Sequence, residues 1–586
     1  MKYSLIACLL LCFGIASAQL SVQNDAFVFV NDQVLFVNDD VNLDDANSSL
    51  YLRNEAQLLQ GTGTTGNSGV GRLSIYQTGT VNQWSYNYWC SPVGNNSALN
   101  GNEDARVALL NDATGLTTSV PALFTGGFNG IATPLTISDR WLWTFQTSTS
   151  YSDWVYVGST GAINPGLGFT MKGNGTGITG SQLYDFRGKP NNGTISNPVS
   201  AGDFTLVGNP YPSAMDSAAF IHDSDNANAI EDTLFYWEQD GTIASHTLVD
   251  YVGGYSEFTI NPAGTVITTA PAVFFTYDEQ DNVLPLPPPG ANGTKLARRY
   301  IPIGQGFMVQ GIAGTTGTVR AKNSHRVYEK EGTDSFFFRN SNPGLDYQEN
   351  GLTLVPDDYK RFRVNVDFTV GESQYTRQVV LNFHDSATFD HDRGLELMRS
   401  DNYASDAYFT LNDKSYSGQA YPFSETLTIP LIVDIEEQQP LRFRIFDVQN
   451  FDDSQGIYIH DIENELYIDL RHQDYDLNIE PGHYTDRFEI VFVAGETLSI
   501  DNFDISNLSI IQNNDIQLLN VINPNGTDVR SIEVFDVAGK LMINKAYSSV
   551  LNQYELSTAK LSDGVYIVNV TSDANTVKSK KIIVKH

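Results

Sequence analysis

The stretch Ser531-Ile-Glu-Val-Phe-Asp-Val-Ala-Gly-Lys-Leu-Met-Ile543 decides how the end of the chain folds. Apolar and polar residues alternate through its first half, which places Ile532 and Val534 on one face of a β-strand. Ala538-Gly539 interrupts the alternation, and Lys540 begins a second strand. The stretch therefore predicts a β-hairpin with a short turn that contains glycine.

The residues after this hairpin continue the same pattern. A turn signal at Asp563-Gly564 precedes the strand-like run Val565-Tyr-Ile-Val-Asn-Val570. The chain then ends in Val577-Lys-Ser-Lys-Lys-Ile-Ile-Val-Lys-His586. Short alternating strands separated by turns are typical of antiparallel sandwiches. The end of the chain thus predicts a small immunoglobulin-like β-sandwich whose last strand is basic.

Three segments of this predicted sandwich resemble a known domain. Val534-Phe-Asp-Val-Ala-Gly-Lys540, Leu561-Ser-Asp-Gly-Val-Tyr-Ile-Val568 and Lys580-Lys-Ile-Ile-Val-Lys585 are similar, in order and spacing, to the type A C-terminal sorting domain of the type IX (Por) secretion system of Bacteroidetes. Asn523-Pro-Asn525 stands where the family often has Tyr-Pro-Asn-Pro, which leaves the start of the domain open. The motif positions carried over by this resemblance are Asp536, Gly539, Lys540, Asp563, Gly564, Tyr566, Lys580, Lys581 and Lys585.

The resemblance implies a route out of the cell. The end domain would dock with the type IX secretion machinery and then be removed by its sortase, and the remaining chain would often be fixed to surface lipopolysaccharide. The alternative is an ordinary immunoglobulin-like end domain without a sorting role. Either interpretation concerns the destination of the protein and leaves its activity open.

The first residues predict a signal peptide. Lys2 supplies the positive charge, residues 5–15 form an apolar run, and Ala16-Ser-Ala18 is a small-residue cleavage site. Cleavage between Ala18 and Gln19 is expected, and the mature chain would contain no membrane span. A lipoprotein signal is disfavoured because Cys12 follows the large residue Leu11. We therefore expect passage through the periplasm by the Sec route and then a secreted or outer-membrane surface protein.

Composition and charge narrow the class further. The chain has 48 Gly, 32 Phe and 29 Tyr among 586 residues, only 18% charged residues, and many short alternating runs, which predicts an all-β, multidomain protein. Its net charge of -33 repels phosphate backbones, so we expect no nucleic-acid partner. Cys90 alone remains after signal cleavage, which excludes an internal disulfide in the mature chain. Cys90 is interpreted as a buried small residue rather than a nucleophile.

The pattern divides the chain into six parts. Short strands in 19–83 indicate a small β-solenoid or a meander. Residues 84–334 carry a diverged internal duplication, and 335–495 contain seven or more short strands typical of a β-sandwich or jelly roll. These parts are, in order, the signal peptide 1–18, the short-strand region 19–83, the region 84–334, the sandwich 335–495, a linker 496–512 and the sorting domain 513–586.

The duplication rests on four segments that recur in the same order in 84–173 and 206–311. Trp89-Cys-Ser-Pro-Val-Gly-Asn95 corresponds to Leu206-Val-Gly-Asn-Pro-Tyr-Pro-Ser213, and Asn164-Pro-Gly-Leu-Gly-Phe169 corresponds to Ile301-Pro-Ile-Gly-Gln-Gly-Phe307. The second copy, together with 335–495, also resembles segments of large secreted flavobacterial proteins that carry the same sorting domain. That resemblance implies how the domains are arranged but does not imply any catalytic or binding activity.

Calcium is the one cofactor for which the sequence offers a candidate site. Asp390-His-Asp-Arg-Gly-Leu-Glu396 places the carboxylates of Asp390, Asp392 and Glu396 around a glycine, as acidic calcium loops do. Calcium needs six or more oxygen ligands, and the segment supplies three residues. The alternative is a solvated Asp-rich turn.

Three Asp-Ser/Thr-X triplets look like the short motif that is O-glycosylated in exported Bacteroidetes proteins. They are Asp216-Ser-Ala218, Asp232-Thr-Leu234 and Asp385-Ser-Ala387, so the candidate sites are Ser217, Thr233 and Ser386. So short a pattern also arises by chance.

No catalytic motif is present in the sequence: H-E-x-x-H, G-x-S-x-G and a Walker loop are all missing. We therefore expect a non-enzymatic protein that acts in adhesion, in an extracellular matrix or in the structure of the cell surface. The alternative is a carbohydrate-binding or glycan-degrading exoprotein, in which exposed rings stack on sugars. The candidate rings are Trp141, Trp143, Trp154, Tyr236 and Trp237. Rings packed between sheets would favour the first hypothesis, and a groove with two facing carboxylates the second.

Overall fold

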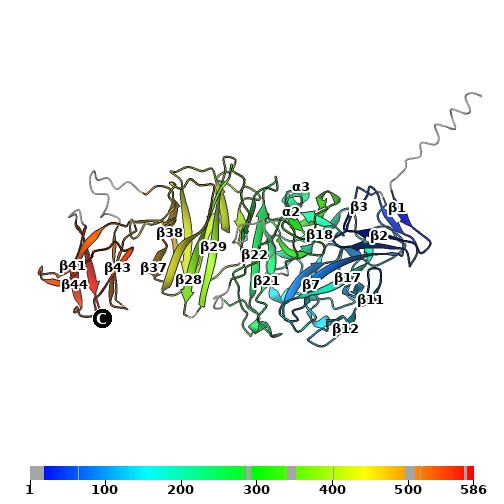
Figure 1. Cartoon of the computed structure of the whole chain (residues 1–586), viewed down its shortest axis with the longest axis horizontal. Helices are drawn as coiled ribbons and strands as arrows, with labels where there is room; N and C mark the ends of the chain where they lie inside the picture. Colours follow the sequence, from blue (N-terminus) through cyan, green and yellow to red (C-terminus); the bar gives the residue numbers. More distant parts are fainter. Residues whose placement is uncertain are drawn as a thin grey trace, which may run out of the picture.

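Figure 1 shows the computed structural model of the chain, in which successive β units follow one another along the long axis. The predicted signal peptide, with Ala18, and residues 496–507 of the predicted linker lie outside the described residues. Strands dominate the rest, which confirms the all-β, multidomain prediction. Among the described residues, no helix is both long and apolar enough to span a membrane. The structure describes residues 19–63, 65–279, 282–284, 292–338, 352–371, 373–399, 401–494, 508–514, 516–524, 526–572 and 577–586.

The first unit is a β-solenoid, because its strands pair in parallel from one turn of chain to the next. β1 pairs with β4, β2 with β5, β5 with β7, and β3 with β6. Apolar side chains alternate inward and fill the space between the rungs. The strands are β1 (Leu20–Val22), β2 (Phe27–Asn31), β3 (Val34–Val37), β4 (Val41–Leu43), β5 (Ser49–Arg53), β6 (Gln57–Gln60) and β7 (Arg72–Thr80).

Two pairs of strands lie at the centre of the next region. They are β8 (Tyr86–Cys90) with β16 (Gly168–Lys172), and β19 (Phe204–Gly208) with β25 (Gly306–Gln310). Both pairs are antiparallel. In each, the glycine that opens the second strand lies opposite the last residue of the first: Gly168 faces Cys90, and Gly306 faces Gly208. The two segments therefore form the same strand pair in the same register.

Reciprocal backbone bonds join these two strand pairs. The N–H of Cys90 donates to the carbonyl of Gly304 at 2.8 Å, and the N–H of Gly208 donates to the carbonyl of Gly166 at 3.2 Å. Gly166 and Gly304 have φ of 81° and 78°, in the left-handed region that favours glycine. The local two-fold arrangement supports our proposal that 84–173 and 206–311 are diverged copies of one unit.

The remaining elements of this region extend and cover the two strand pairs. A sheet in the order β19-β25-β21-β22-β23 carries the second pair. Single 3-10 turns lie between strands at Val107–Leu109, Asp139–Trp141, Tyr151–Asp153, Leu248–Asp250 and Asn323–His325. The other elements are β9 (Val93–Gly94), β10 (Leu110–Ala113), β11 (Ser119–Pro121), β12 (Leu123–Thr125), β13 (Thr136–Ser138), β14 (Trp143–Thr144), β15 (Val155–Tyr156), β17 (Ser181–Pro190), β18 (Ile195–Val199), β20 (Ala214–Asp216), α2 (Ser217–Ile221), α3 (Ser224–Ala227), β21 (Leu234–Gln239), β22 (Gly253–Ile260), β23 (Ile267–Ala270), β24 (Tyr300–Ile301), β26 (Gly317–Ala321) and β27 (Arg326–Val327).

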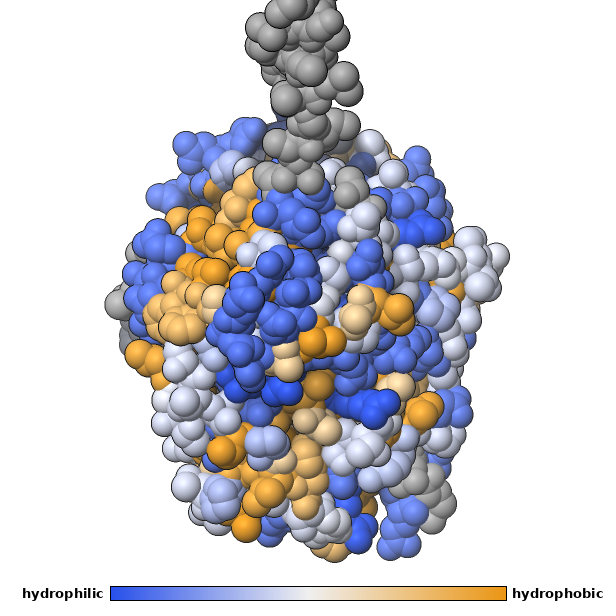
Figure 2. Space-filling view, turned by 90° about the vertical axis from the view of Figure 1, so that its right-hand side faces the viewer, coloured by the Kyte–Doolittle hydropathy of each residue, from blue (hydrophilic) through white to orange (hydrophobic). Residues whose placement is uncertain are grey.

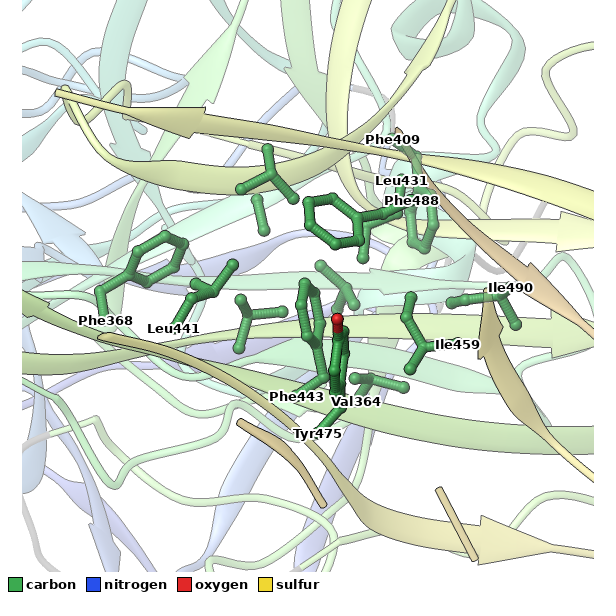
Figure 3. Packing of buried hydrophobic residues seen from close by; sticks show 14 of the residues in the cluster. Val364, Phe368, Phe409, Leu431, Leu441, Phe443, Ile459, Tyr475, Phe488 and Ile490 are labelled. Atoms are coloured by element: carbon green, nitrogen blue, oxygen red, sulfur yellow. The ribbon is translucent and has the colours of Figure 1, made fainter. Parts of the chain in front are cut away.

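The third unit is one sheet that curls around a single core. Its strands run in the order β36-β35-β38-β33-β31-β32-β29-β28-β34-β37, and Figure 3 shows side chains of β31, β33 and β38 facing those of β28, β34 and β37. Residues 335–338 pack instead on the preceding region, where Phe337 lies 4.6 Å from Trp89 between ring centroids. The strands are β28 (Lys360–Val370), β29 (Ser373–Phe383), β30 (Leu397–Met398), β31 (Asp406–Leu411), β32 (Lys414–Tyr421), β33 (Thr428–Ile435), β34 (Gln439–Gln449), β35 (Tyr458–Asp461), β36 (Leu466–Asp469), β37 (Tyr475–Ile479) and β38 (Gly482–Val491).

The last unit is the predicted C-terminal sandwich. A three-stranded sheet, β39-β40-β43, packs on a four-stranded sheet, β42-β41-β44-β45. Ile532 and Val534 are fully buried between the sheets, as the alternation predicts. The first strand contains the end of the predicted linker. The strands are β39 (Ser509–Asn513), β40 (Leu518–Ile522), β41 (Val529–Asp536), β42 (Leu541–Ala546), β43 (Gln553–Ser557), β44 (Gly564–Ser572) and β45 (Val577–Val584).

Replacing Gly208 by alanine should destabilise the contact between the two strand pairs. An added Cβ would lie 2.4 Å from the carbonyl oxygen of Gln305 and 2.5 Å from the Cβ of Cys90, closer than carbon atoms approach in proteins. We expect the free energy of unfolding, measured by urea denaturation, to fall by about 2 kcal/mol. The matched control is Gly126→Ala, because no atom lies within 4 Å of its added Cβ. Equal stability of the two variants would contradict the prediction.

Candidate functional site

The first group of sorting-motif residues forms the turn between β41 and β42. Oδ1 of Asp536 accepts hydrogen bonds from the N–H groups of Ala538 and Lys540, both at 2.9 Å. Gly539 has φ of 81°, which other residues adopt only at a cost in strain. Asp536 and Gly539 therefore shape this hairpin, and their place in the motif has a structural reason.

The second group of motif residues ties the start of β44 to the end of β45. Oδ1 of Asp563 accepts from the N–H of His586 and lies 2.9 Å from its Nδ1, and this bonding lowers the pKa of Asp563. Gly564 opens β44, and the hydroxyl of Tyr566 donates to the carbonyl of Ser562 at 2.9 Å. The motif thus fixes where the last strand lies.

The lysines of the motif are the part that is presented to solvent. Lys580, Lys581 and Lys585 are exposed, while Ile582 and Val584 point into the core. They lie on or directly after β45, an edge strand of its sheet in the described structure. Lysines on an edge strand discourage pairing with other sheets. This basic edge on an acidic protein is a ready contact for an acidic partner.

The predicted calcium residues form a loop that bonds largely to itself. Oδ2 of Asp392 accepts from the N–H of Thr388 at 2.6 Å, and Oε2 of Glu396 accepts from the N–H of Asp392 at 2.7 Å. Asp390 is exposed, and its carbonyl accepts from the hydroxyl of Thr388. Within the residues described, no three His, Cys, Asp or Glu side chains are placed to hold a metal ion. The geometry matches the alternative, an Asp-rich turn, and the calcium hypothesis is untested.

The same loop brings a histidine between two buried carboxylates. Nε2 of His391 lies 3.4 Å from Oδ2 of Asp232, and its Nδ1 lies 3.6 Å from Oε2 of Glu396. Burial, with the nearby charges of Asp232 and Asp392, raises the pKa of Glu396 to about 9. Burial opposes the ionisation of both Asp232 and His391, but their mutual hydrogen bond lowers the pKa of Asp232 and raises that of His391. This cluster joins the duplicated region to the third unit.

The three glycosylation candidates differ in access. The hydroxyl of Ser217 is buried and donates to the carbonyl of Arg299 at 2.6 Å. The hydroxyl of Thr233 is buried and accepts from the N–H of Met398 at 2.9 Å. Ser386 is exposed and bonds to His384. A modifying enzyme can thus reach only Ser386 of the three in the folded chain, and its glycosylation stays a prediction.

Most of the candidate sugar-stacking rings pack against other rings. Trp237 stacks on Tyr88 at 6.2 Å and 12° between the rings, and Trp154 lies 5.9 Å from the same tyrosine. Tyr236 is buried at 5.3 Å from Phe338. These rings fill the space between the two copies and the neighbouring sheets.

Trp141 belongs to an aromatic cage around a buried lysine that the sequence did not single out. Nζ of Lys172 lies 4.0 Å from the ring centroid of Trp141, 4.5 Å from that of Tyr251 and 4.6 Å from that of Tyr86. Nδ1 of His246 lies 3.1 Å from the same nitrogen. Burial lowers the pKa of Lys172 to about 6, and burial together with Lys172 lowers that of His246 to about 4. The cage holds the loop that carries His246 and Tyr251 against the first copy.

A groove of about 400 Å³ opens between the two copies beside Trp237 and Tyr86. Its acidic residues are already engaged: Glu238 accepts from the N–H groups of Thr294 and Lys295, and Asp240 accepts from Thr242. Glu238 and Asp240 come from one strand and its end, so they do not face each other across the groove. The groove therefore lacks the opposed carboxylates of a glycosidase.

The sequence did not predict that Lys172 and His246 belong to the aromatic cage, or that His391 lies between Asp232 and Glu396. Their partners are distant in the chain, and no local spacing signals the contacts. The one available signal was a lysine within the apolar strand Gly168–Lys172, where a charge is unusual.

Comparison with known families gives two matches. Residues 127–492 match the domain of unknown function DUF8693, and residues 512–585 match the secretion system C-terminal sorting domain. The second match confirms the predicted sorting domain and supports export by the type IX system. No curated protein gives a match. Among solved structures, a biofilm associated protein (BSP domain) is 8% identical, covering 87% of this chain and 96% of that chain, and its TM-score of 0.14 is too low to carry an argument.

The raised pKa of Glu396 predicts a specific dependence of stability on pH. Its folded pKa of about 9 exceeds its ordinary value of 4.5. The folded protein therefore binds more protons than the unfolded chain between these values, and this residue lowers the free energy of unfolding as pH rises. Glu396→Gln should remove this decline and gain about 4 kcal/mol relative to the unaltered protein between pH 5 and pH 8.

Urea denaturation at pH 5, 6.5 and 8 measures this gain. Glu437→Gln, at an exposed position, is the matched control and should follow the unaltered protein at every pH. Parallel curves for Glu396→Gln and the unaltered protein would contradict the raised pKa.

The bonding of the 388–396 loop predicts that calcium does not stabilise the protein. Asp392 already accepts from Thr388, and Glu396 already accepts from the N–H of Asp392, so both side chains are engaged within the loop. We expect the melting temperature to be unchanged by a chelator and by added calcium. A lower melting temperature in the chelator, lost in Asp392→Asn, would instead establish the calcium site.

Proposed function

This chain belongs to the family of the domain of unknown function DUF8693, and we propose that it is a non-enzymatic protein of the cell surface or the medium. Its role would be in adhesion, in an extracellular matrix or in the structure of the cell surface. Its C-terminal sorting domain supports export by the type IX secretion system. The proposed adhesion or structural role is inferred from the described residues that precede that domain.

The observation that carries the proposal is the packing of the tryptophans. Trp154 and Trp237 pack against Tyr88, Tyr255 and other rings, and Trp237 also borders the groove described above. A sugar-binding platform needs a free ring face, whereas Trp154 and Trp237 each contact several other rings. The interior aromatics therefore favour a rigid structural body over a glycan-processing cleft.

The charged groups favour the same conclusion. Two carboxyl groups with shifted pKa, Asp232 and Glu396, lie in a buried joint between two units and not in a cleft. The groove beside Trp237 has no opposed carboxylates, and its Glu238 holds a backbone loop. At Asp232 and Glu396 the shifted pKa values thus accompany structural contacts.

Export and binding can be tested on the same cells. One strain makes the full chain, and a second makes a chain that stops after Ala494, which removes the whole C-terminal sandwich without leaving β39 unpaired. We expect the full-length product outside the outer membrane, beginning at Gln19 and lacking the end domain, and the shortened product in the periplasm. Cell fractionation with terminal-peptide mass spectrometry measures both.

The exported protein is then tested for adhesion to surfaces and for release of reducing sugars from polysaccharides. Adhesion without sugar release supports the proposal. Sugar release would establish the glycan-degrading alternative, and equal export of both chains would overturn the sorting role.

A further inference from the structure

The first rung of the solenoid has an open end. Leu20, Val28, Val30 and Leu35 point into the core but are only partly buried. In the next rung their ladder partners are Val41, Leu50, Leu52 and Leu58, whose exposed fractions are 0 to 1%. The difference arises because, among the described residues, no strand covers the outer edge of β1, β2 and β3.

The backbone of this edge has its hydrogen-bonding groups directed outward. The carbonyl of Ala26 accepts from the N–H of Ser49, and the N–H of Asp32 donates to the carbonyl of Arg53, so these positions face the next rung. Backbone groups alternate along a strand. The N–H and carbonyl groups of Phe27 and Phe29 therefore point away from the solenoid, where another strand can pair with them.

This edge lacks the devices that normally keep sheets apart. Natural edge strands carry lysine, proline or bulges, and the terminal repeats of solenoids carry a polar cap. Residues 20–37 contain no Lys, Arg, Pro or Gly. The side chains of Phe27 and Phe36 are 60% and 62% exposed. Figure 2 looks onto this end of the molecule and shows apolar residues gathered in patches across it.

The charge of the rung is low for this protein. Its acidic residues are Asp25 and Asp32, in a chain of net charge -33. Asp32 forms an ion pair with Lys330, which cancels one of these charges. Two copies of so acidic a chain repel each other overall, and the low charge of this rung keeps the electrostatic cost of contact at this end small.

We propose that the open rung binds the same rung of a second copy of this chain. A two-fold axis across the solenoid would pair β2 with the partner subunit's β2, and β1 with the partner subunit's β3. The two-fold reverses chain direction, so these pairs are antiparallel ladders. It also sets two identical apolar cross-sections against each other and closes one continuous core.

Contacts of this kind would link copies of the protein into a surface structure. In this respect the inference rests on the proposed function. The sorting domain lies at the opposite end of the molecule (Figure 1). A copy held at the cell surface by its C-terminal side would thus present its open rung outward to another copy.

The test is the oligomeric state of the purified protein beginning at Gln19, measured by sedimentation across protein concentrations. We expect a dimer at micromolar concentration. Val28→Lys places a charge in the open core, where the long side chain can still reach solvent. It should move the monomer–dimer midpoint to at least about tenfold higher concentration.

A second pair of variants separates backbone pairing from loss of an aromatic ring. Phe29→Pro removes the outward N–H and no hydrogen bond within the solenoid, while Phe29→Val loses the ring and keeps the N–H. We expect Phe29→Pro to be monomeric and Phe29→Val to remain a dimer. Thermal melts check that all variants are folded.

Either of two results would overturn the proposal: a monomeric unaltered protein at every concentration, or dimers that persist in both Val28→Lys and Phe29→Pro. Export of the variants is followed in parallel and should equal that of the unaltered protein, since the sorting domain is unchanged. Failed export would count against the proposed function, whereas failed dimerisation with normal export would count against this inference alone.

Discussion

The reciprocal pair of backbone bonds between the two copies is the constraint on which the centre of the structure depends. Cys90 and Gly208 each donate to a left-handed glycine of the other copy, so neither strand end is satisfied without its counterpart. The approach is so close that a side chain at Gly208 or Gly306 would meet backbone atoms. Around this contact, Trp89 and Tyr88 turn to opposite sides and enter different cores. One close approach thus positions both the aromatic interior and the groove beside it.

At the C-terminal end, the residues of the sorting motif form two groups: some determine the fold, and others supply exposed positive charge. Asp536 and Gly539 build a turn, and Asp563 fixes the end of the last strand, so these positions are explained by folding. Lys580, Lys581 and Lys585 are exposed, and they present a basic edge on a strongly acidic protein. The other motif residues hold that basic edge in place.

Polar contacts, rather than apolar ones alone, join the duplicated region to the third unit. His391 lies between two buried carboxylates there, and Arg363 donates to the carbonyl of Thr269 and to Gln378. Hydrogen bonds of this kind require exact placement of both partners, and so they fix the orientation of the two units. The family match, residues 127–492, covers most of the duplicated region together with the third unit. The open solenoid rung and the sorting domain lie at opposite ends of the molecule.

The sequence by itself determined the all-β class, the C-terminal sandwich and the turns of its motif, because alternation and glycine turns are local signals. Ile532 and Val534 are buried as that alternation requires. Only the tertiary structure decided which polar residues would be buried. In β28 the same alternation assigns Arg361 and Arg363 to the solvent side, yet both are fully buried, because β23 covers that face. It likewise enclosed Lys172 in rings from distant segments and left the first rung open. Burial of a second face depends on contacts far apart in the chain, and no local pattern encodes them.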